Sequence, residues 1–151
     1  MHNALIIALG SPVYVGIYDE QGQLIESIKD DGLGSDVLPL IFEDVLNRYR
    51  LKHLIYANGP GSFMGIKVAY LFLKTLSIVR NIPLLAVDGF FFNKNHPIKA
   101  VGKLYFVKNS NTIGVEPLDN PVLKGFELPQ TIEVKNFNTD SAPYYGIEAV
   151  G

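Results

Sequence analysis

The sequence predicts a mixed α/β fold with one main hydrophobic core, followed by a smaller β-rich region. Three short apolar segments at the N-terminus are separated by turn residues, as in a sheet meander. A helix, a strand, a second helix and a further strand follow, and such alternation is typical of α/β domains. A chain of 151 residues can bury one sizeable core and a small appendage. We therefore expect a first domain over residues 1–92 and a reduced second domain over 93–151.

The first three strands are predicted at residues 4–9, 13–19 and 23–28. Turn-forming residues occupy 10–12 and 20–22, between the apolar segments. Connections this short join neighbouring antiparallel strands, so we expect a three-stranded meander.

The first helix is predicted over residues 36–50. Ser35 or Asp36 is the expected N-cap, which leaves Pro39 in the first turn, where proline is tolerated. Apolar residues recur three and four positions apart, as on the buried side of an amphipathic helix. These residues are Leu38, Ile41, Phe42, Val45, Leu46 and Tyr49.

The most specific segment is residues 58–67, which read Asn-Gly-Pro-Gly-Ser-Phe-Met-Gly-Ile-Lys. It follows a short buried strand predicted at 54–57. Pro60 excludes helix within the turn, so a second helix must begin after it, with Ser62 as its N-cap. A strand, a glycine-rich turn and a helix N-terminus together offer free N–H groups to an anion. The candidate phosphate-facing residues are Gly59, Pro60, Gly61, Ser62, Phe63 and Gly65.

The glycines at 59, 61 and 65 have the spacing G-x-G-x-x-x-G. It fits neither a Walker A loop nor the dinucleotide-binding fingerprint. A tight strand-to-helix connection without any ligand explains the spacing equally well.

The second helix, over residues 63–80, is apolar on more than one side. We expect a core-facing side made of Gly65, Val68, Ala69, Phe72, Leu76 and Val79. The opposite side has more apolar surface than an exposed helix normally carries, which favours a protein–protein interface with an aromatic centre and a basic rim. The alternatives are that the second domain covers this side, or that these are scattered exposed apolar residues. The candidate interface residues are Leu40 on the first predicted helix and Lys67, Tyr70, Leu71, Lys74 and Ile78 on the second.

Beyond a strand predicted at 84–87, the pattern changes to short extended pieces separated by polar turns. Residues 109–111 are expected to form a hairpin connection, and the tail over 136–151 to be irregular. The extended pieces are expected at 103–108, 112–116 and 131–135.

Residues 59–67, Gly-Pro-Gly-Ser-Phe-Met-Gly-Ile-Lys, resemble the Gly-Pro-Gly-Ser-Phe-Thr-Gly-Leu-Arg signature of the bacterial TsaB (YeaZ) family. The resemblance extends through 36–41 and 81–88 and covers residues 4–90. It implies an actin-like ATPase (ASKHA) fold with a ribonuclease-H-like core, whose element order matches the one predicted above. In the family the second domain is usually larger, so the resemblance implies that it is trimmed here.

The resemblance also implies a function. Members of this family, once described as glycoprotease (peptidase) homologues, are non-catalytic partners of TsaD in making the threonylcarbamoyladenosine of tRNA, next to the anticodon. The two helices that correspond to 36–50 and 63–80 make homodimers or the TsaD complex. The expected partners are therefore a TsaD-like protein and a TsaE-like ATPase of the same complex, with a homodimer as a further option and tRNA contacted only indirectly.

Catalytic residues are not evident in the sequence. Active ATPases of this fold place an aspartate at the end of the first strand, whereas residues 7–11 contain none. His2, His53 and His96 lack metal-ligand spacing, so neither a metal nor a cofactor is expected. The alternative to a partner subunit is a small actin-like nucleotide-binding enzyme or phosphotransferase, with the loop at 59–65 holding phosphate.

Composition sets broader limits on the chain. A net charge of −2 argues against tRNA binding by this chain alone, because such binding needs clustered Lys and Arg. The sequence contains no cysteine, which excludes disulfides and thiolate metal sites and favours a cytoplasmic location. The N-terminus lacks a signal-peptide pattern, and no segment reaches the ~20 apolar residues of a membrane span.

Overall fold

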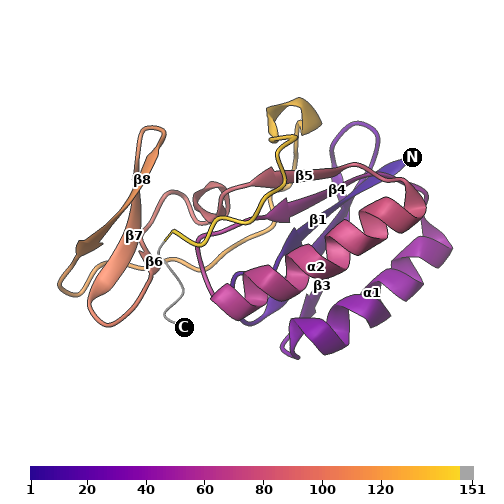
Figure 1. The fold of residues 1–151 in the computed structure, drawn as a ribbon. Helices are drawn as coiled ribbons and strands as arrows, with labels where there is room; N and C mark the ends of the chain where they lie inside the picture. The colour runs from indigo at the N-terminus through magenta and orange to yellow at the C-terminus, as the bar shows by residue number, and fades with distance from the viewer. Residues whose placement is uncertain (147–151) are drawn as a thin grey trace.

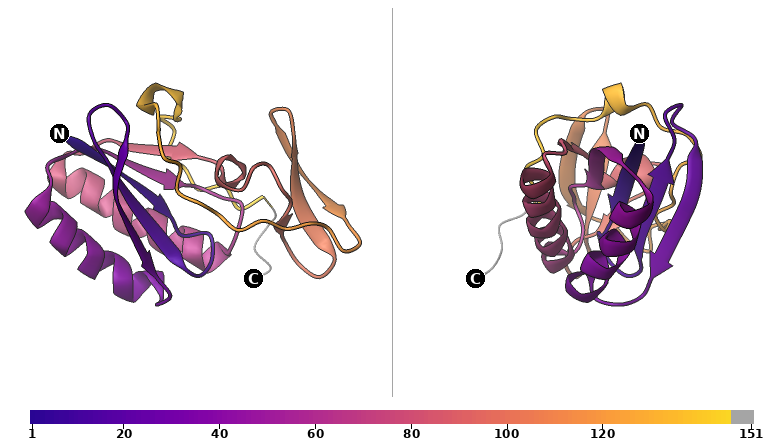
Figure 2. Two further views of the ribbon diagram at one scale, coloured as in Figure 1. Left: turned by 180° about the vertical axis from the view of Figure 1, so that it is seen from behind. Right: turned by 90° about the vertical axis from the view of Figure 1, so that its right-hand side faces the viewer.

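The computed structural model describes residues 1–146 as a mixed α/β protein with two sheets (Figure 1). The larger sheet has five strands in the order β3-β2-β1-β4-β5, and the smaller has three in the order β6-β7-β8. Both long helices cover one face of the larger sheet (Figures 1 and 2). Within residues 1–146, no helix is long and apolar enough to cross a membrane.

The five-stranded sheet has the predicted meander and two parallel strands beside it. β1 (His2–Ile7), β2 (Val13–Tyr18) and β3 (Leu24–Asp30) pair antiparallel in succession, which confirms the meander. β4 (Leu51–Ala57) runs parallel to β1, and β5 (Leu84–Val87) runs parallel to β4. β4 begins three residues earlier than predicted, whereas β5 has the predicted bounds.

The central strands are buried on both faces, so the sheet has a core on each side. Along β1, Ala4 and Ile6 pack with the two helices, whereas Leu5 and Ile7 pack on the other face. This division follows from the two-residue alternation of side chains along a strand.

Helix α1 (Gly34–Arg48) begins and ends two residues earlier than predicted. Its N-cap is Leu33, which provides no side-chain hydrogen bond, so the prediction of Ser35 or Asp36 as cap is wrong. The Leu33 carbonyl instead accepts the Asp36 N–H at 2.9 Å. Because the helix starts earlier, Pro39 lies beyond the first turn, where its missing N–H removes one helical hydrogen bond.

Helix α2 (Phe63–Arg80) has the predicted bounds and the predicted cap. The Gly65 N–H donates to Ser62 Oγ at 3.1 Å, which satisfies one of the free N–H groups of the first turn. At the other end Asn81 adopts the left-handed conformation, with φ of 55°, and stops the helix.

The buried side of α2 differs from the predicted one. Ile66, Ala69 and Leu73 are the buried residues, and Val79, predicted to face the core, is 72% exposed. The helix is apolar on most sides, so periodicity alone could not orient it. Packing decides instead: α2 sits on the sheet and beside α1, where the Phe42 and Phe72 rings lie 5.7 Å apart.

The smaller sheet contains β6 (Ile98–Lys99), β7 (Leu104–Asn109) and β8 (Thr112–Pro117). The β7–β8 hairpin and its connection are confirmed, and Ser110 takes the positive φ of 57° that a tight turn requires. β6 was not predicted, because two residues carry no periodic signal.

The chain after β8, residues 118–146, is called the return segment. It returns to the larger sheet and covers the face opposite the helices (Figure 2). The strand predicted at 131–135 is wrong: Thr131 makes only an isolated bridge to Gln23, and Val134–Asn136 form a 3-10 turn. This return segment contributes Ile132 and Phe137 to the second core. The domain boundary at residue 92 stays a prediction, and the predicted irregular tail lies partly outside the described residues.

Candidate functional site

The glycine-rich loop between β4 and α2 is closely packed on its neighbours. Gly59 has a φ of +131°, and a Cβ there would overlap the Tyr144 carbonyl of the return segment. A Cβ at Gly61 would lie 2.8 Å from the Leu9 carbonyl oxygen, closer than real Cβ contacts. These two glycines are therefore required by close backbone approach.

The third glycine and the cap residue complete this arrangement. A Cβ at Gly65 would lie 2.6 Å from the carbonyl oxygen of Ala8, so α2 closely approaches the end of β1. Several loop N–H groups already have acceptors: Ser62 donates to the Leu9 carbonyl at 2.9 Å, and Asn58 donates to the Val87 carbonyl at 3.0 Å. The phosphate-facing role of this loop stays a prediction.

Ser62 and Phe63 differ in their surroundings. Ser62 lines a hollow of about 330 Å³ between the start of α1 and the start of α2. Phe63 packs edge-on against Tyr145, with ring centroids 5.4 Å apart. The return segment therefore shields one side of Phe63.

The outer sides of α1 and α2 carry exposed apolar residues, which we call the helix surface: Leu40, Met64, Leu71 and Ile78. Their exposed fractions lie between 54% and 70%. The three residues on α2 are seven positions apart, so they form one stripe along the helix. An exposed apolar stripe along α2, with a further exposed leucine on α1, is the kind of surface that another protein covers.

The other predicted interface residues are divided between surface and interior. Lys67 is exposed and Lys74 is half-buried on the same helix. Tyr70 is also half-buried, and its ring lies 6.1 Å from that of Tyr56, in contact with the core. The structure therefore places Tyr70 at the inner edge of α2. Met64 is an exposed residue that was not among the predicted interface residues.

The histidines have ordinary structural surroundings. His53 Nδ1 lies 2.9 Å from Asn3 Oδ1, and burial lowers the pKa of this imidazole. His96 Nδ1 lies 2.9 Å from the Asn93 carbonyl oxygen. Over residues 1–146, no group of three or more His, Cys, Asp or Glu side chains is placed to hold a metal ion.

Comparisons with known proteins support the fold. The sequence matches no family model and no curated protein. Among solved structures, an uncharacterized protein with similarity to peptidase YeaZ from Pseudomonas aeruginosa superposes with a TM-score of 0.61 at 15% identity, over 81% of this chain and 69% of that one. YeaZ from Pseudomonas aeruginosa gives a TM-score of 0.59 at 14% identity, over 85% of this chain and 65% of that one. This chain has the YeaZ fold.

The comparison with YeaZ structures also shows a difference in size. The chain spans 69% and 65% of the two YeaZ-like structures. At 15% and 14% identity, the similarity shows that the chains share a fold. The activity of this chain has to be inferred from its own residues.

Proposed function

We propose that this chain is a non-catalytic, TsaB-like subunit that binds and stabilises a TsaD-like protein during threonylcarbamoyl transfer to tRNA. The helix surface, present on a YeaZ fold, is the observation that carries the proposal. The signature over residues 59–67 supports the same family. In this proposal the chain contributes a binding surface, and the TsaD-like partner performs the reaction.

The composition of the helix surface suits a partner interface. Burying an exposed Leu, Ile or Met side chain contributes about 1.5–3 kcal/mol, so the four residues can offset a substantial part of the cost of association. Lys67 is exposed on the same helix and gives the surface a basic rim, where charges direct association more than they add affinity.

The proposal assigns tRNA binding mainly to the assembly. A chain with a net charge of −2 lacks the excess of cations that binds phosphates strongly. The TsaE-like ATPase is proposed as a further member of the assembly. ATP hydrolysis is proposed to lie outside this chain, because β1 ends at Ile7 and no carboxylate follows before Asp19.

Size-exclusion chromatography with light scattering tests the proposal, using the TsaD-like protein of the same organism. We expect a one-to-one complex with the unmodified chain and none with the double variant Leu71→Glu, Ile78→Glu. Val122→Glu is the matched control, because this valine is 75% exposed and lies outside both helices. It should retain the complex.

Two results would contradict the proposal. One is the absence of any complex, even with nucleotide and the TsaE-like protein present. The other is a complex that the double variant leaves unchanged. A chain whose mass is doubled alone, and stays doubled when the TsaD-like protein is added, would indicate a stand-alone homodimer using the helix surface.

The nucleotide-binding enzyme is the alternative function. It requires the loop at 59–65 to bind phosphate, although the N–H groups of Ser62 and Gly65 already have acceptors within the protein. Calorimetry with ATP and ADP decides this point. Measurable affinity that is abolished by Gly61→Val would favour the enzyme over the partner subunit.

A further inference from the structure

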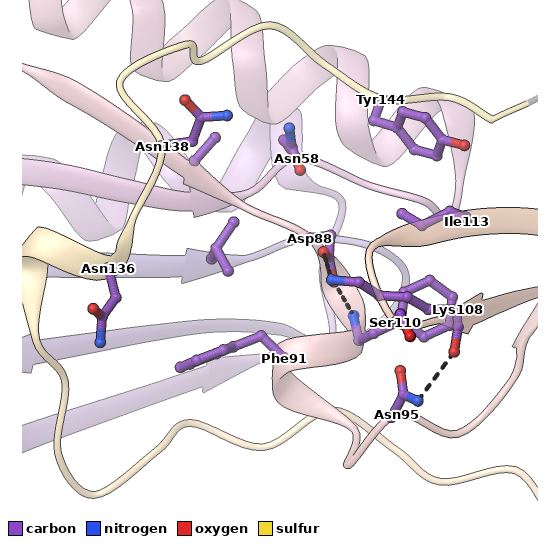
Figure 3. Close-up of a pocket in the computed structure, with 13 residues that line it drawn as sticks. Asn58, Asp88, Phe91, Asn95, Lys108, Ser110, Ile113, Asn136, Asn138 and Tyr144 are labelled. Atoms are coloured by element: carbon purple, nitrogen blue, oxygen red, sulfur yellow. Dashed lines mark hydrogen bonds and ion pairs between the residues drawn. The ribbon is translucent and has the colours of Figure 1, made fainter.

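A pocket of about 650 Å³ lies where the larger sheet meets the β7–β8 hairpin (Figure 3). Ala86 and Val87 of β5 and Lys108 of β7 contribute to its lining. The return segment closes another side through Asn138 and Tyr144. Three parts of the chain that are distant in sequence therefore build this pocket, and none of its lining residues belongs to α1 or α2.

An ion pair joins the two sheets inside the pocket. Lys108 Nζ lies 2.5 Å from Asp88 Oδ2, while Asp88 Oδ1 accepts the Phe90 N–H at 3.0 Å. The carboxylate is therefore occupied on both oxygens, and it neutralises the lysine. Among the residues that line the pocket, these are the two that carry full charges near neutral pH. A highly charged anion such as a triphosphate would find no unpaired cation here.

Four asparagine side chains supply most of the remaining polar groups. Asn58 Nδ2 donates to the Ala142 carbonyl at 3.0 Å, and Asn95 Nδ2 donates to the Lys108 carbonyl at 3.2 Å. Within residues 1–146, the side-chain oxygens of both asparagines lack a protein partner. Asn136 and the Nδ2 of Asn138 also lack one over this range. The pocket thus offers both donors and acceptors of amide type.

Aromatic rings complete the lining. Phe91 is 49% exposed, although its ring packs edge-on against Phe92 at 5.1 Å and Phe137 at 5.7 Å. Tyr144 stands on the opposite side of the close-up (Figure 3). An exposed aromatic face beside unpaired amides suits a flat ring that has donors and acceptors along its edge.

We propose that this pocket binds an uncharged purine nucleoside. Side-chain amides pair with the donor and acceptor atoms on a purine edge, and aromatic rings stack on its faces. Because Lys108 is already paired with Asp88, a phosphate would lose hydration here without gaining a free cation, so the free nucleoside is preferred to the nucleotide. The volume lies within the range of small-molecule sites. The site is separate from the helix surface, so either proposal can fail without the other.

Isothermal titration calorimetry with adenosine tests the site on the whole chain. We expect saturable binding with a Kd below about 1 mM, and adenosine monophosphate should bind no more tightly. Asn136→Ala and Phe91→Leu should each weaken binding by about three- to tenfold, because each removes one contact. Asn47→Ala is the matched control, since Asn47 is exposed on α1, and it should bind adenosine as the unmodified chain does.

Other results would overturn the proposal. One is no heat of binding with adenosine or guanosine at millimolar concentration. Another is tighter binding of the monophosphate than of adenosine. A third is an adenosine affinity in both pocket variants that equals that of the unmodified chain. A single-stranded penta-adenylate that binds more tightly than adenosine would also overturn it, because it would indicate a base within RNA as the ligand. Circular dichroism of each variant confirms that the fold is retained.

Discussion

Arg48 at the end of α1 and Glu26 on β3 form a bidentate ion pair. The two guanidinium nitrogens of Arg48 each lie 2.7 Å from one carboxylate oxygen of Glu26. The guanidinium also binds Asp44 one turn earlier, and the Tyr49 hydroxyl donates to Glu26 at 2.7 Å. The pair attaches the last turn of α1 to the edge strand of the larger sheet. Two parallel bonds of this kind fix orientation better than a single contact.

Glu26→Gln tests the contribution of this pair. Hydrogen bonds from Arg48, followed by that from Tyr49, lower the pKa of Glu26 from 4.5 to about 2. A carboxyl whose pKa is lower when folded adds stability above its unfolded pKa and loses it as the pH falls through its folded pKa. We expect the variant to lower the Tm by roughly 2–5 °C at pH 7, with a difference that shrinks from pH 4.5 to pH 2.

Scanning calorimetry at several pH values makes this measurement. Glu43→Gln is the control, because Glu43 is exposed on the same helix and makes no ion pair within residues 1–146. A loss of Tm in Glu26→Gln that is equal at pH 7 and pH 2 would exclude the ion pair as its cause.

Gly61→Ala should destabilise the protein by about 1–3 kcal/mol, because the new Cβ would press on the Leu9 backbone and force it to move. Gly114→Ala on β8 is the control, since a Cβ there has nothing within 4 Å. Urea unfolding measures both free energies. If the two substitutions cost the same, the close approach of the loop to Leu9 has no energetic role.

Tyr56→Phe should cost about 1–2 kcal/mol, because it leaves the Ser141 carbonyl without the hydroxyl that now donates to it at 2.5 Å. We also expect faster hydrogen exchange at the Tyr144 N–H, which is bonded to the Asn58 carbonyl in the same segment. Tyr105→Phe, whose hydroxyl has no partner in the described chain, should alter neither quantity. An unchanged exchange rate at the Tyr144 N–H in Tyr56→Phe would show that this hydroxyl does not help to hold the return segment in place.

Asn81→Ala should destabilise α2 by about 1 kcal/mol, since alanine disfavours the left-handed conformation with φ of 55°. Asn81→Gly keeps this conformation accessible and should stay within about 0.5 kcal/mol of the unmodified chain. Thermal unfolding of the two variants compares them directly. Equal stability of the two would show that the backbone conformation at this cap is unimportant.

Local signals predicted much of the fold. The bounds of α2 followed from the turn before it and the side-chain cap at Ser62, and β5 followed from a short apolar run between turns. The start of α1 was predicted two residues late, because Leu33 caps it through its backbone and leaves no mark in the sequence.

Features that depend on distant contacts could not be predicted in this way. The buried side of α2 is set by contacts with the sheet and α1, and so Val79 was predicted to face the core although it is exposed. Tyr70 is half-buried against the core, and its role in an interface stays a prediction. The candidate pocket joins Asn58, Lys108 and Tyr144, which no local pattern relates. The exposure of Leu71 and Ile78 agrees with the prediction, because surplus apolar residues on a helix are visible in its periodicity.

The anchoring of Ser141 to Tyr56, 85 residues earlier, has a consequence for synthesis on the ribosome. A nascent chain that has released β4 and α2 still lacks the segment that packs on Gly59. Contacts of such long sequence separation form late and slow the folding of a domain. The glycine-rich loop therefore acquires its final geometry only after residues 141–144 have left the exit tunnel.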